Sequence, residues 1–147
     1  MLYVPNFIWT KRQPENYAVY AQHENRVLLA FERVGEISVT GAAVFFSDFN
    51  PRFPLSLWSL WLCASLFLML LYEVFWIRYF KSEKKMRDFY RPLIGIPVPG
   101  ASLPVAAFLL LAVYGGNIVL LVLTVILGVG HIGIHVGHLK ETREEGE

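Results

Sequence analysis

The chain has 147 residues, of which 55% are hydrophobic and 17% charged, and its mean hydropathy is +0.46. Soluble domains carry about 25% charged residues, so this composition indicates a protein that resides in lipid. The net charge of +1 and the single cysteine exclude a nucleic-acid-binding protein and a disulfide-stabilised scaffold.

The first 26 residues are expected to form an interfacial N-terminal segment. Their opening apolar stretch is short and is interrupted by Pro5, and it lacks the basic start and cleavage pattern of a signal peptide. The alternative is that this stretch is what remains of a further span in a longer form of the protein.

Four apolar stretches are predicted to cross the bilayer, at residues 27–46, 55–77, 103–114 and 118–138. A crossing helix needs about 20 apolar residues. The second stretch is the strongest, whereas the third is short. Pro54 can start the second helix, and the Gly115-Gly116-Asn117 turn joins the last two as a hairpin. We therefore predict an all-α fold: one transmembrane domain over residues 1–147, built as a four-helix bundle.

The basic residues predict the orientation of this bundle. Twelve of the 13 lysines and arginines lie on one side of the membrane if both termini are cytoplasmic, and Arg52 alone lies outside. The prediction is a multi-pass protein of the plasma or inner membrane with a cytoplasmic tail at 139–147. Residues 81–91 are expected to be a solvated cytoplasmic loop, with binding of anionic lipid headgroups as the alternative.

The last predicted span ends in three histidines, His131, His135 and His138, at i, i+4 and i+7. At about 100° per residue, they share one helix face of about 60°. The opposite side carries Gly133 and Gly137, small enough for close helix contact. A homodimer through these two glycines is one prediction.

Three predicted intramembrane carboxylates, Glu32, Glu36 and Glu73, lie at nearly the same depth as the histidines, near the cytoplasmic side. Charged side chains are costly in lipid, so they should face the interior of the bundle. Arg33 offers an alternative explanation, because it can pair with Glu36 or Glu73 in a purely structural cluster.

Imidazoles and carboxylates at one depth predict a site for a divalent metal ion, zinc or iron. Helix bundles commonly build metal sites from facing glutamates and histidines. The candidate ligands are His131, His135, His138, Glu32, Glu36 and Glu73. His138 lies close to the membrane boundary, so an interfacial role is the alternative for it.

The first functional hypothesis is a cytoplasm-facing intramembrane site that acts on a lipid-borne substrate through metal-activated water. The alternatives are a small cation- or proton-coupled transporter or channel subunit, and a non-catalytic membrane scaffold whose polar cluster is structural. Membrane lipids are the expected partners. The sequence contains neither a nucleotide-binding loop nor a Gly-x-Ser-x-Gly elbow, so neither motif assigns an enzyme class.

Overall fold

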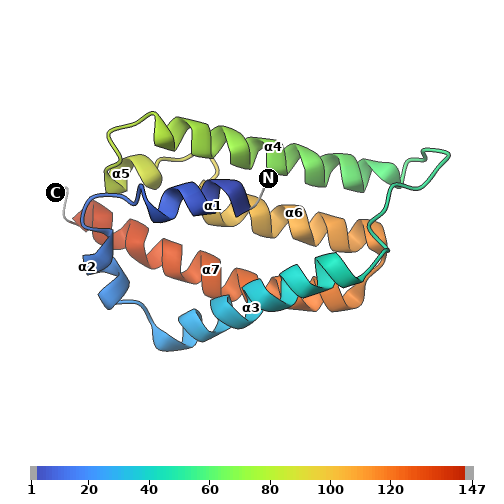
Figure 1. Ribbon diagram of the computed structural model, residues 1–147, viewed down its shortest axis with the longest axis horizontal. Coiled ribbons are helices and arrows are strands. Elements are labelled where there is room, and N and C mark those ends of the chain that lie inside the picture. The colour runs from blue at the N-terminus through green and yellow to red at the C-terminus, as the bar shows by residue number, and fades with distance from the viewer. Residues whose placement is uncertain (1–2, 145–147) are drawn as a thin grey trace.

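The computed structural model of the protein describes residues 3–144, which form seven helices and no strand (Figure 1). The all-α prediction is confirmed over this range. Residues 1–2 of the predicted interfacial segment and residues 145–147 of the predicted tail lie outside the described residues.

Four long helices lie antiparallel in a row, and each packs on its neighbour (Figure 1). Their order across the row is α4 (Ser59–Phe80), α6 (Pro99–Gly115), α7 (Ile118–Glu144) and α3 (Arg26–Phe45). Two of them, α4 and α7, are long and apolar enough to cross a membrane, whereas α6 is apolar but shorter. The helices match the four predicted spans to within a few residues, except that α7 continues through Glu144.

Three short helices complete the fold. Helix α1 (Tyr3–Thr10) runs in nearly the same direction as the long helices, between α3 and α4 in this view, and makes a polar contact with each (Figure 1). The Tyr3 hydroxyl is 2.6 Å from Oγ1 of Thr40 on α3, and Tyr72 on α4 donates to Oδ1 of Asn6 at 3.5 Å. Helices α2 (Tyr17–Gln22) and α5 (Met86–Phe89) lie at the end of the row where α7 finishes (Figure 1).

Local signals fix where the long helices begin and end. The Asn25 side chain accepts two backbone N–H groups of the first turn of α3. Helix α6 begins at Pro99, four residues earlier than predicted, because a proline in the first turn gives up no helical hydrogen bond. Gly116 ends α6 with φ 65°, and Oδ1 of Asn117 caps α7 by accepting the N–H of Leu120 at 2.8 Å.

Two glycines allow α3 and α7 to approach closely. A Cβ atom at Gly130 would lie 2.6 Å from the backbone oxygen of Leu28, and one at Gly35 would lie 2.5 Å from Cα of Leu127. Both contacts are with backbone or with the base of a side chain, so neither leaves room for a methyl group.

The two glycines of the predicted dimer contact differ in their surroundings. Gly133 faces the side chain of Leu28 within the same chain, and a Cβ there would lie 3.1 Å from Cδ1 of that leucine. Gly137 has nothing within 4 Å of such an atom. Homodimer formation stays a prediction, for which Gly137 is the more accessible of the two positions.

The basic segment 81–91 differs from the expected solvated loop, because its aromatic residues fold inward. Met86, Phe89 and Tyr90 are buried, with Tyr90 only 3% exposed. The Arg78 guanidinium holds the segment by donating to the backbone oxygens of Arg91 and Pro92, at 2.5 and 2.8 Å. This anchoring places Tyr90 directly beside the histidines of α7.

Candidate metal centre

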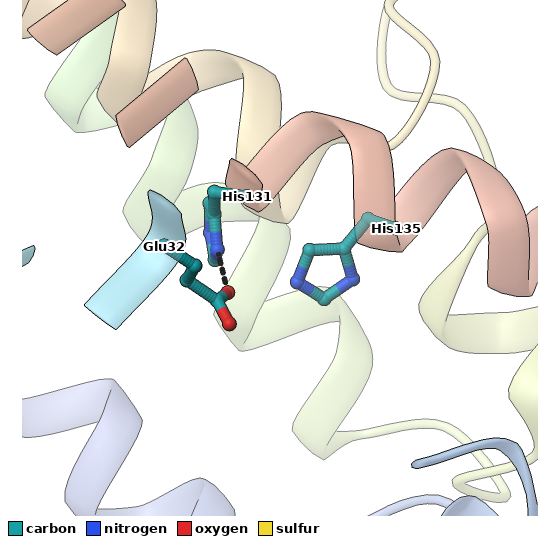
Figure 2. A group of neighbouring side chains, drawn as sticks. All are labelled: Glu32, His131 and His135. Atoms are coloured by element: carbon teal, nitrogen blue, oxygen red, sulfur yellow. Dashed lines mark hydrogen bonds and ion pairs between the residues drawn. The ribbon is translucent and has the colours of Figure 1, made fainter. Parts of the chain in front are cut away.

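Glu32, His131 and His135 form a compact group between α3 and α7 (Figure 2). Each residue offers one ligand atom, and these three atoms all lie within 4.8 Å of one another. The two histidines are one helical turn apart, so the 3.6-residue period alone brings them together. Glu32 joins them because Gly130 carries no side chain that would hold α3 away.

The shortest contact in the group is a hydrogen bond between His131 and Glu32. The Nδ1 atom of His131 lies 2.5 Å from Oε1 of Glu32, and an ionised carboxylate can only accept. The side chains are 21% and 13% exposed, respectively. A metal ion that bound both Nδ1 of His131 and Oε1 of Glu32 would displace the proton of this bond, because metal ligands must be deprotonated.

His135 is the most enclosed member of the group. It is 8% exposed, and its ring lies 4.7 Å from the ring of His131, centroid to centroid. Its Nδ1 atom is 2.9 Å from the hydroxyl of Tyr90. The other ring nitrogen, Nε2, faces Glu32 (Figure 2).

The remaining predicted ligands lie apart from this group. Glu36 lines the same cavity, but it is partly exposed and lies 3.8 Å from the Arg33 guanidinium. Glu73, on α4, is outside the group and outside the cavity lining, and its Oε1 atom is buried without a hydrogen-bond partner. His138 lies one turn beyond His135, where its Nε2 atom is 3.4 Å from Oε1 of Glu24.

The sequence did not point to Tyr90 and Glu24, whose side-chain oxygens lie within polar contact of the histidines. The Tyr90 hydroxyl lies between two imidazoles, 2.9 Å from Nδ1 of His135 and 3.0 Å from Nδ1 of His138. Burial raises the pKa of Tyr90, so the hydroxyl keeps its proton. The pKa of Glu24 is raised by burial and then by the charge of Glu32. The signal for Tyr90 was an aromatic pair, Phe89-Tyr90, inside an otherwise basic segment.

A cavity of about 510 Å³ adjoins the group, with His131, His135 and Glu32 in its wall. All seven helices contribute to the wall, together with Gln13 and Glu24 from the segments on either side of α2. One part of the lining is charged, and the larger part is apolar or aromatic, including Val39, Val105, Phe108, Leu127, Tyr72 and Trp76. The lining is therefore amphipathic.

Two imidazoles and one carboxylate are the donor set of many catalytic zinc and iron sites, which leave further positions open for water or substrate. Ligand atoms around a tetrahedral zinc ion lie about 3.3 Å apart, given bond lengths of about 2.0–2.1 Å. Metal binding would therefore lengthen the His131–Glu32 contact and draw His135 closer.

Comparison with protein families, curated proteins and solved structures gives no match for this chain.

Proposed function

We propose that the protein is a four-span membrane protein that binds a divalent metal ion, zinc or iron, through Glu32, His131 and His135. The metal site faces the amphipathic cavity and acts on a lipid-borne substrate by activating a water molecule. The observation that carries this proposal is the convergence of three metal-binding side chains from two helices on the wall of one cavity.

The outward faces of the helices support the membrane assignment. Helix α3 is the least apolar of the four, yet Val34, Ile37 and Val44 on its outer side are 56%, 75% and 75% exposed. Glu32 on the same helix turns inward to His131. A helix with apolar residues outside and a carboxylate inside suits a lipid environment. Helix α4 likewise exposes Leu60, Leu66, Phe67, Leu70, Val74 and Ile77.

The lengths of the helices agree with four crossings. Helices α3 and α4 have 20 and 22 residues, which is about 30 and 33 Å, close to the thickness of the hydrocarbon core. Helix α6, with 17 residues, spans about 26 Å and can rely on α4 and α7 on either side. The basic segment 81–91 and the end of α7 lie together at one end of the row, and Arg52 belongs to the loop at the other end (Figure 1). We therefore place segment 81–91 and the end of α7 on the cytoplasmic side, whereas α1 lies beside the spanning helices, with Tyr3 against Thr40 in the outer half of α3.

The cavity supports a lipid-borne substrate. Its volume falls within the range of about 300–1,000 Å³ that is usual for ligand sites. Its charged part would bind a polar head beside the metal, and its apolar part would bind the attached chain. A small polar substrate would leave most of this apolar lining unused.

Metal content tests the central part of this proposal. Protein purified from cells grown with added zinc or iron is expected to carry about one metal ion per chain. The double variant His131→Ala/His135→Ala is expected to carry none, because only one carboxylate ligand remains. Equal and substoichiometric metal in both proteins would contradict the proposal.

A chelating amphiphile tests the substrate class. Octyl hydroxamate joins a metal-binding head to a chain, whereas acetohydroxamate has the same head alone. Each buried methylene contributes about 0.8 kcal/mol, so the octyl compound should bind zinc-loaded protein at least about 100-fold more tightly. The zinc-free protein in the same nanodiscs is the control for simple partitioning into lipid. If the two hydroxamates bind equally well, the apolar part of the cavity is not used.

A further inference from the structure

Four side chains beside the metal centre form a series of polar contacts. Its order is Glu24, His138, Tyr90 and His135. The contact distances are 3.4 Å from Glu24 Oε1 to His138 Nε2, and 3.0 and 2.9 Å from the Tyr90 hydroxyl to the Nδ1 atoms of His138 and His135. These contacts connect the segment that follows α2, the residue that follows α5, and α7.

The direction of these contacts is set at the Glu24 end. The Nε2 atom of His138 lies 3.4 Å from Oε1 of Glu24 without forming a hydrogen bond, and a negatively charged oxygen at this distance favours the tautomer whose proton faces it. The His138 side chain is 3% exposed, and the rings of Tyr17 and Tyr20 lie 5.7 and 5.9 Å from it, centroid to centroid. Such an enclosed imidazole is neutral, because burying its charged form is costly. A neutral ring protonated at Nε2 has a bare Nδ1 atom.

The remaining steps follow from the hydrogen-bonding capacity of a tyrosine. Its hydroxyl has a single proton, which Tyr90 gives to the bare Nδ1 of His138. The Tyr90 oxygen then accepts a hydrogen bond from His135, whose Nδ1 atom must therefore carry a proton. The lone pair of His135 is left on Nε2, the ring nitrogen that faces Glu32 in Figure 2.

We propose that Tyr90 is a positioning residue that holds His135 in the tautomer protonated at Nδ1, with Glu24 and His138 fixing the direction of the hydrogen bonds. The Nε2 lone pair of His135 is thereby presented to the cavity wall before any ligand arrives. Protein groups that bond the second nitrogen of a metal-binding histidine have this effect in general, and they fix ring orientation as well. The consequence for metal affinity rests on the proposed function, whereas the tautomer itself does not.

Nitrogen NMR of the metal-free protein tests the tautomer directly. With ¹⁵N-labelled histidine, a long-range ¹H–¹⁵N correlation spectrum distinguishes the two tautomers and the cation, and single histidine substitutions assign the signals. The wild type is expected to show His135 protonated at Nδ1 and His138 protonated at Nε2. A wild-type His135 protonated at Nε2, or a charged His138, would overturn the proposal.

The variant Tyr90→Phe keeps the buried ring and removes only the hydroxyl. His135 is then expected to lose its fixed tautomer, and zinc affinity is expected to fall by about 10–100-fold. Tyr79→Phe is the matched control, because the Tyr79 hydroxyl donates to the backbone of Arg12 at 2.8 Å and touches no histidine. An unchanged His135 spectrum in Tyr90→Phe would overturn the proposal. Since the spectra are recorded without metal, a failure of metal binding leaves this result interpretable.

Discussion

Replacing His135 with alanine is expected to lower the affinity of the protein for zinc by at least about 100-fold. Structural zinc sites bind with apparent free energies of about 10–16 kcal/mol, so one ligand of about four contributes roughly 3 kcal/mol. A loss of 3 kcal/mol corresponds to about 100-fold in the dissociation constant. Competition with a chromophoric chelator measures this constant in detergent or nanodiscs.

The substitution Glu32→Gln should act in the same direction as His135→Ala, because an amide binds zinc far less well than a carboxylate. Glu73→Gln makes the same chemical change on α4, outside the cavity lining, and is the matched control. We expect Glu73→Gln to keep the wild-type zinc affinity. If both glutamine variants lose affinity equally, the metal is bound elsewhere than between α3 and α7.

The substitution Gly130→Ala is expected to destabilise the protein by about 1–3 kcal/mol, the usual cost of overfilling a packed interior. The added methyl group would collide with the backbone N of Glu32 and would lie 2.6 Å from the backbone oxygen of Leu28. Neither atom can rotate away, so α3 has to move as a whole. That movement separates Glu32 from His131, and zinc affinity should fall together with stability.

The control for this prediction is Gly137→Ala on the same helix. Its new methyl group meets nothing within 4 Å, and alanine favours a helix over glycine by up to about 1 kcal/mol. Unfolding midpoints in detergent should therefore stay unchanged or rise slightly for Gly137→Ala and drop for Gly130→Ala. Equal midpoints and equal zinc affinities in both variants would show that α3 does not pack this closely on α7.

The positions of the helices were predictable from sequence because their signals are local. Predicted residues 27–46 correspond to α3, and the Gly116-Asn117 turn that joins α6 to α7 was predicted from those residues alone. The start of α6 was predicted four residues too late, at residue 103 instead of Pro99. Pro99 occupies the first turn, where proline is tolerated.

The pairing of side chains depended on tertiary packing and was predicted only in part. Helical spacing was enough to place His131 beside His135. Glu32, and not Glu73, joins the histidines because α3 approaches α7 closely. The identity and spacing of the ionisable residues do not reveal this approach. Tyr90 lies 45 residues from His135 along the chain, and its burial depends on α5 and on the anchoring of that segment by Arg78.

X-ray absorption spectroscopy of the zinc-loaded protein tests the central claim most directly, because it reports the atoms bound to the metal. We predict a first shell of nitrogen and oxygen at about 2.0–2.1 Å, with the outer-shell scattering of two imidazole rings. That imidazole scattering should disappear in His131→Ala/His135→Ala. A first shell of oxygen alone, without imidazole scattering in the wild type, would contradict a metal site formed by Glu32, His131 and His135.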